Sequence, residues 1–176
     1  MRTHSSQERK QLRLLDATMI IMGQSGERRI AAENFFTGIY ETALSPQELL
    51  VAVELPIGRK NSVHFFREFA RRHGDYAIVG LAAQAIVERD VFADLGLAFF
   101  AVGDRPVSAR AAKKLINVAI TPSVLSDAST ALAEELDPQS DQQASASMRR
   151  HLAKVLLARC VAALLGRPDL NAGGPA

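Results

Sequence analysis

The segment from Phe65 to Ala77 holds the residues of this chain that are best suited to bind a ligand. It reads FFREFARRHGDYA, with three arginines and a His-Gly-Asp turn ahead of Tyr76. Gly74 can adopt a positive φ, and the Asp75 carboxylate can accept hydrogen bonds from neighbouring backbone groups. Such a turn could present the Tyr76 ring to a flat ligand, and an ordinary turn with a half-buried tyrosine has the same pattern.

Other common chemistries have little support in the sequence. None of the four histidines lies at a metal-binding spacing from another histidine, a cysteine or a carboxylate, so we expect no metal site. Nucleophile and phosphate-loop motifs are missing, so we expect no catalytic residue. Cys160 lies on an apolar helical stripe and is interpreted as a buried core thiol. Glu134 and Glu135 are adjacent on a predicted helix, where they would face solvent.

Composition narrows the class of protein. The chain has 176 residues, of which 48% are hydrophobic, which predicts one domain, or one domain and the remnant of another. Lys and Arg total 21 against 19 acidic residues, a balance that does not favour nucleic-acid binding. The arginines near the His-Gly-Asp turn would make only weak phosphate contacts. No apolar run is long enough to span a membrane, and a single cysteine fits a reducing cytoplasm.

The first half of the chain reads as strands. Residues 17–23 and 27–31 are predicted to form a hairpin around a turn at 24–26, followed by a connector whose Phe35 and Phe36 pack in a core. Four further apolar or alternating runs predict a small antiparallel sheet of three or four strands. These runs are residues 49–55, 62–70, 76–87 and 91–102.

The last third changes to a helical period. Ser108 is predicted to cap a short helix, and Thr121 with Pro122 to begin a second, which ends at Asp137. An apolar stripe over residues 148–164 predicts a long third helix. The basic residues Arg149, Arg150, Lys154 and Arg159 would lie largely off this stripe. The predicted fold class is therefore α+β, a small antiparallel sheet followed by a three-helix bundle.

Four short motifs occur along the chain, and together they point to one family. They are FFTGIYETAL at 35–44, PQELLVAVELP at 46–56, FARRHGDYAIVG at 69–80 and ASASMRRHLA at 144–153. In this order they resemble the FAD-binding medium subunits of molybdenum hydroxylases, the xanthine dehydrogenase and carbon monoxide dehydrogenase family. Asn34 stands where that family usually has Asp, and Met148 where it has Tyr.

The resemblance implies a role as one subunit of an oxidoreductase. Electrons would pass from a molybdenum-cofactor large subunit, through an iron–sulfur small subunit, to FAD and then to an acceptor such as NAD. Leu50 matches a leucine packed near the isoalloxazine, and Arg67 a basic residue near the ring, where a cation favours reduced, anionic flavin. Tyr76 matches the residue beside the ring. Asp75 of the same motif is also expected to bind the cofactor.

One departure from the family concerns the pyrophosphate. The family binds it with two glycine-rich loops that lie upstream of anything matched here. We therefore expect this chain to be the C-terminal part of such a subunit, with an exposed apolar patch on its hairpin and weak or absent FAD binding on its own. A partner chain would supply the loops. The alternative is a non-catalytic assembly or protein-interaction module that keeps the fold without FAD.

The domain organisation expected from this resemblance has three parts. Residues 1–44 would be a tail and a remnant of the second FAD-binding subdomain. Residues 45–166 would be the C-terminal domain of the flavin subunit, and 167–176 a flexible tail.

Overall fold

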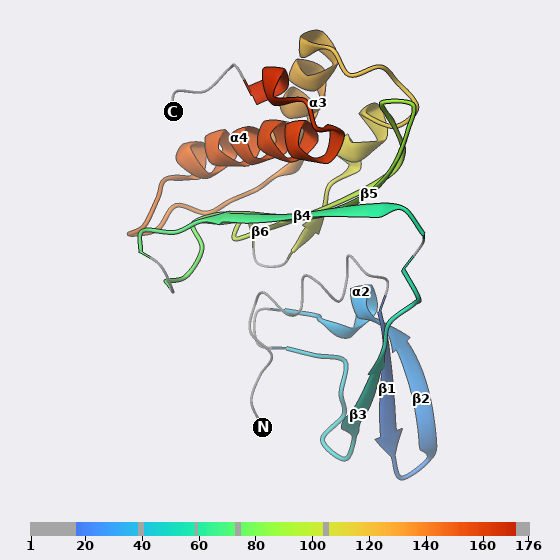
Figure 1. Cartoon of the computed structure of the whole chain (residues 1–176). Coiled ribbons are helices and arrows are strands. Elements are labelled where there is room, and N and C mark those ends of the chain that lie inside the picture. Colours follow the sequence, from blue (N-terminus) through green and yellow to red (C-terminus); the bar gives the residue numbers. More distant parts are fainter. Residues whose placement is uncertain (1–16, 39–40, 59, 73–74, 104–105, 172–176) are drawn as a thin grey trace. The chain divides into compact units, whose positions relative to one another are not determined.

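The computed structural model forms two compact units, residues 1–58 and 59–176. Each has its own antiparallel sheet (Figure 1). The described residues are 17–38, 41–58, 60–72, 75–103 and 106–171. The α+β class predicted from the sequence is confirmed.

The first unit is built on a three-stranded sheet in the order β2-β1-β3. Strands β1 (Thr18–Gly23) and β2 (Gly26–Ala31) form the predicted hairpin, with Gly23 paired to Gly26 across a two-residue turn. Gly26 has a φ of 104°, a left-handed conformation that a side chain would strain.

The core of the first unit forms where the sheet meets a short helix. Helix α2 (Ala32–Phe35) follows β2 directly and places Phe35 and Phe36 against Met19 and Ile21. The two phenylalanine rings pack edge to face, with centroids 5.0 Å apart. Their predicted role in a core is confirmed.

Strand β3 (Leu49–Glu54) corrects two expectations. It pairs antiparallel with β1, so it belongs to the first unit and not to the sheet of residues 62–102. The break between the units therefore falls after Gly58, later than the expected boundary at 44/45. Among the described residues of this unit, most of the exposed large apolar side chains lie on this strand and just after it, and one lies in the hairpin. They are Leu49, Val51, Val53, Leu55 and Ile57, with Met22 in the hairpin.

The second unit contains a four-stranded antiparallel sheet in the order β4-β5-β6-β7. Its strands are β4 (Ser62–Phe69), β5 (Val79–Glu88), β6 (Val91–Phe100) and β7 (Val107–Ser108). Strands β5 and β6 are joined by the short polar turn that the sequence predicts. Arg89 and Asp90 both take positive φ there, at 50° and 63°.

Helices cover one face of this sheet (Figure 1). They are η1 (Arg110–Lys114), α3 (Pro122–Glu135) and α4 (Ala146–Leu165). Alternate residues of β5, such as Leu81 and Ala83, are buried against Leu156 and Cys160 of α4 in one continuous core. The Thr121 hydroxyl accepts a hydrogen bond from the Val124 amide at 3.3 Å, which confirms the predicted start of α3.

Two expectations about the helical layer are wrong. Ser108 caps no helix, since it lies in β7, and the cap of η1 comes from Glu135. The Glu135 carboxylate accepts from the backbone amides of Arg110 and Ala111 at 2.9 and 3.2 Å. It is therefore a cap from a distant part of the chain and not a residue of a solvated face.

The chain also stays ordered beyond the last long helix. Helix α4 ends at Gly166, whose φ of 64° suits a glycine C-cap. A short helix η2 (Pro168–Asn171) follows, in which Leu170 is buried in the core of the unit. The Arg167 guanidinium donates to the Ile120 carbonyl at 3.1 Å. Residues 167–171 are thus packed, contrary to the expected tail, and 172–176 lie outside the described residues.

Candidate functional site

The loop between β4 and β5 carries the candidate binding residues of the second unit. Its base is closed by a hydrogen bond from the Ile78 amide to the Phe69 carbonyl, at 2.7 Å. The centroid of the Phe69 ring lies 5.4 Å from the central carbon of the Arg159 guanidinium. His73 and Gly74 of the predicted turn lie outside the described residues. We call the described residues on either side of them, 70–72 and 75–77, the β4–β5 loop.

Asp75 organises the C-terminal side of this loop. Its amide donates to the Arg72 carbonyl at 3.1 Å, and its carboxylate accepts from the Tyr76 amide at 2.8 Å. This is the local capping that the sequence predicts for an aspartate in a turn. The backbone that carries the Tyr76 side chain is therefore fixed by its neighbour.

Tyr76 itself is 81% exposed, although large aromatic side chains usually bury much of their surface. The sequence placed it at the entry of a strand, but β5 begins only at Val79, so the ring stands on the loop. Within the described residues it is therefore available to a ligand.

The other two predicted positions lie in different units. Arg67 is exposed on β4, paired with Leu81 of β5, two residues before the base of the β4–β5 loop. Leu50 lies on β3 of the first unit, opposite Ile21, and is half-buried against that unit's core. The structure thus brings Arg67, Asp75 and Tyr76 together in one unit and leaves Leu50 in the other.

A buried arginine holds the framework of this site, and sequence reasoning missed it. Arg149, in the first turn of α4, is only 5% exposed, although the helical pattern placed it toward solvent. Its guanidinium donates to the carbonyls of Ile78 and Ala101, at 2.5 and 2.9 Å. It also forms an ion pair with Asp141 at 2.6 Å.

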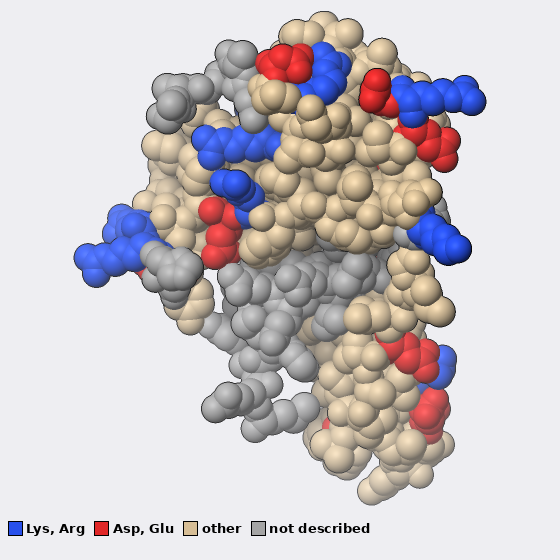
Figure 2. Space-filling model, viewed as in Figure 1, with Lys and Arg blue, Asp and Glu red and all other residues tan. Residues whose placement is uncertain are grey.

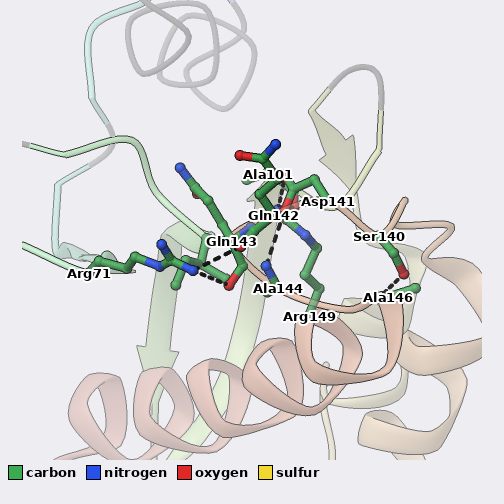
Figure 3. A network of polar contacts seen from close by, with 10 residues as sticks. Arg71, Ala101, Ser140, Asp141, Gln142, Gln143, Ala144, Ala146 and Arg149 are labelled. Carbon is green, nitrogen blue, oxygen red and sulfur yellow. Dashed lines mark hydrogen bonds and ion pairs between the residues drawn. The ribbon is translucent and has the colours of Figure 1, made fainter.

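Asp141 joins this arginine to a second loop, residues 141–144 (Figure 3). Its carboxylate accepts from the backbone amides of Gln143 and Ala144, at 2.8 and 3.1 Å. These backbone hydrogen bonds, together with the Arg149 guanidinium, lower the pKa of Asp141 to about 2. The carboxylate is therefore ionised at any physiological pH.

Arg71 provides a contact between the two loops. Its guanidinium donates to the Gln142 carbonyl at 2.9 Å and to the Gln143 carbonyl at 3.4 Å (Figure 3). Of the three arginines near the turn, this one is therefore occupied by backbone and is less suited to hold a phosphate. On the face shown in Figure 2, Lys and Arg side chains stand in separate groups, several of them beside Asp or Glu.

The arrangement offers ring stacking and positive charge. Among the described residues there is no group of three histidine, cysteine or acidic side chains that could hold a metal ion. Burial raises the pKa of the Cys160 thiol, which agrees with its predicted place in the core and makes it a poor nucleophile. Side chains of these kinds are suited to a flat ligand, and such a ligand would have to supply any redox chemistry itself.

Comparison with known proteins gives two family matches. Residues 64–164 match the CO dehydrogenase flavoprotein C-terminal domain. Residues 1–58 match the FAD binding domain in molybdopterin dehydrogenase. The two matches meet close to the division between the two units.

Individual relatives agree with these matches. The chain is 30% identical to the glyceraldehyde dehydrogenase medium chain of Sulfolobus acidocaldarius, over 82% of this chain and 52% of that protein. It is 32% identical to the carbon monoxide dehydrogenase medium chain of Afipia carboxidovorans, over 85% and 52%. The solved structure of quinoline 2-oxidoreductase from Pseudomonas putida 86 superposes with a TM-score of 0.82 at 34% identity, over 90% and 56%. The chain spans about half the length of the curated relatives it matches.

Proposed function

The chain belongs to the CO dehydrogenase flavoprotein family, the FAD-binding subunits of molybdenum hydroxylases, and we propose that it helps to bind FAD in a multi-subunit oxidoreductase. In such an enzyme electrons would reach FAD from iron–sulfur clusters and leave to an acceptor such as NAD. FAD would supply the redox chemistry, through reversible reduction of its isoalloxazine ring.

The observation that carries the proposal is the exposed ring of Tyr76. It stands on the β4–β5 loop with its backbone fixed by Asp75, within the motif that resembles the family's signature. A flat, rigid side chain held in this way suits stacking against an isoalloxazine, which is itself flat and aromatic. The residues present therefore fit the ring end of FAD.

The other site residues would assist this contact. Arg67 would place a positive charge near the ring, where it favours the reduced, anionic flavin. Leu50 lies half-buried on β3 of the first unit, and its place near the isoalloxazine stays a prediction from the family resemblance. Asp75 would act by orienting Tyr76.

The pyrophosphate end of FAD requires more than these residues. Arg71 donates to two backbone carbonyls, so its guanidinium is partly committed. Glycine-rich loops bind a pyrophosphate with several charge-assisted backbone hydrogen bonds, each contributing about 1.5–3 kcal/mol. We propose that residues outside these 176 supply them, and that without them the 176-residue chain binds FAD weakly or not at all.

Titration of FAD with the purified chain, followed by flavin fluorescence, tests the proposal. We expect a dissociation constant weaker than about 10 μM, raised about fivefold by Tyr76→Ala, which removes about 1 kcal/mol of stacking. Ile57→Ala, which shortens a 99% exposed side chain of the first unit, is the matched control and should change nothing.

Three other outcomes would count against parts of the proposal. A dissociation constant below about 10 μM would refute the view that glycine-rich loops dominate the affinity. Binding that is insensitive to both Tyr76→Ala and Arg67→Ala would refute the site. If no binding occurs up to about 1 mM, alone or with subunits that carry such loops, the assembly-module alternative would replace it.

The proposed partners follow from the same family. Relatives named as medium chains imply a larger and a smaller chain in their complexes. We propose a molybdenum-cofactor large subunit and an iron–sulfur small subunit as partners, and a cytoplasmic location. Within the described residues, no helix has the length and apolar character to cross a membrane.

A further inference from the structure

The β4–β5 loop is held mainly by residues that are remote from it in the sequence. At its base there is one backbone hydrogen bond, from Ile78 to Phe69. Beyond this base, and apart from the local bonds of Asp75, its described contacts run to the 141–144 loop and to the start of α4. The position of Tyr76 therefore depends on that second region.

Arg149 fixes the exit of the β4–β5 loop. It donates to the carbonyl of Ile78, the residue between the loop and β5, and to that of Ala101, just after β6. With 5% of its surface exposed, its guanidinium has few alternative partners in solvent. It thereby ties the start of α4 to one end of the sheet.

Asp141 fixes the entry of the same loop through Arg71. One carboxylate oxygen binds Arg149, while the other accepts the amides of Gln143 and Ala144. The Gln142 and Gln143 carbonyls of this curled segment then accept the Arg71 guanidinium (Figure 3). A single carboxylate thus connects both sides of the β4–β5 loop.

These contacts are separate from the capping of α4. The Ser145 hydroxyl accepts from the Met148 amide at 3.1 Å, and the Ser140 hydroxyl accepts from the Ala146 amide at 2.9 Å. Both serines satisfy amides at the helix N-terminus without Asp141. A role in starting the helix therefore does not account for the Asp141–Arg149 pair.

We infer that Asp141 and Arg149 are positioning residues that hold the β4–β5 loop in the conformation in which Asp75 and Tyr76 receive the flavin. The inference rests on the proposed function for its ligand. The contacts that hold the loop do not depend on a ligand, so they can be tested separately.

Asp141→Asn is the most specific test of this inference. Its amide oxygen still accepts from the amides of Gln143 and Ala144, while the ion pair with Arg149 is lost. Asp169→Asn is the matched control, because Asp169 forms an ion pair of similar length, 2.7 Å, with Arg167 in the same unit. Arg71→Ala removes the second contact, with the exposed Arg110→Ala as its control.

The first readout is amide hydrogen exchange of the 176-residue chain without ligand. We expect Asp141→Asn and Arg71→Ala to speed exchange in peptides covering residues 70–78 by about tenfold, with α4 and the controls unchanged. Unchanged exchange in these peptides would overturn the inference. So would an equal increase throughout α4, because the pair would then only stabilise the helix.

The second readout is FAD affinity by flavin fluorescence. Since Asp141 would act through Tyr76, we expect Asp141→Asn and Tyr76→Ala each to weaken binding about fivefold, and the double variant no more than either. Additive losses would overturn the coupling. If the wild-type chain binds no FAD even when subunits that carry the glycine-rich loops are present, while the exchange result holds, the proposed ligand fails and the positioning of the loop stands.

Discussion

The two ends of strand β5 are closed in different ways. At its C-terminal end, Arg89 and Asp90 turn the chain within two residues, through backbone conformations of their own. At its N-terminal end, the β4–β5 loop is fixed by Arg149, Asp141 and Arg71, across about seventy residues of chain. A turn that only reverses direction can be local. A loop that presents Tyr76 is held instead by a rigid scaffold, as binding loops often are.

The largest effect that tests this contrast is expected from Arg149→Ala. It removes charged donors from two part-buried carbonyls at the loop end of the sheet, which should lower the free energy of unfolding by about 3 kcal/mol. Urea unfolding followed by circular dichroism measures this loss. Arg150→Ala is the control and should cost under about 1 kcal/mol, because its contacts are longer and more exposed. Equal losses would mean that the buried arginine has no special part in closing this end.

The second-largest loss of stability is expected from Gly80→Ala. A Cβ on Gly80 would lie 1.9 Å from the Phe100 ring, which crosses β5 near the loop end and stacks on Phe66 at 5.8 Å. Overpacking of this kind should cost about 2 kcal/mol in urea unfolding. Gly58→Ala, where the added carbon meets nothing, should be close to neutral.

A second substitution checks the cause of that loss. In the Gly80→Ala background, Phe100→Leu should restore part of the stability, since it removes the ring that the new carbon meets. A double variant less stable than Gly80→Ala would show that the clash is not the reason.

Acid should remove the stabilisation that Asp141 gives to the end of the sheet that carries the β4–β5 loop. The pKa of Asp141 is lowered from 3.8 to about 2 on folding, so its contribution is full above the unfolded value and is lost as the pH falls through the folded one. The stability advantage of the wild type over Asp141→Asn should be constant above about pH 5 and shrink between about pH 4 and 2. Urea midpoints at several pH values measure it, and an advantage that persists at pH 2 would contradict the ionic role.

The smallest effect is expected at the short turn. Arg89 has a φ of 50°, a region that asparagine enters at lower cost than most side chains. Arg89→Asn should therefore raise the free energy of unfolding by about 0.5 kcal/mol. Exchange in the peptides of residues 70–78 should stay the same, and a change there would show that the two ends of β5 are not independent.

How far the sequence predicts this fold depends on how local each feature is. The first hairpin, the start of α3 and the core positions of Phe35 and Phe36 follow from turn, capping and apolar patterns, and all are confirmed. The pairing of β3 with β1 could not be predicted from such local patterns, because the residues of a strand do not indicate which other strand it pairs with.

The candidate site shows the same limit. Tyr76 and Asp75 stand out because a His-Gly-Asp turn is visible in the sequence, and the structure gives Asp75 the predicted capping bond. Arg149 lies on a helix where a period of 3.6 residues separates apolar from polar positions, so it was placed toward solvent. Its burial depends on two carbonyls from β-sheet ends and on Asp141, and only the folded chain brings them together. The capping contact of Glu135 with the Arg110 amide could not be predicted for the same reason.

The buried thiol of Cys160 makes it possible to measure how often the core of the second unit opens. It is the single cysteine of the chain and lies with no exposed surface where α4 packs in the core. A thiol reagent can reach it only when that core opens. The rate of alkylation in native conditions therefore reports how often the unit opens. Mass spectrometry of the intact chain would measure this alkylation rate without an engineered probe.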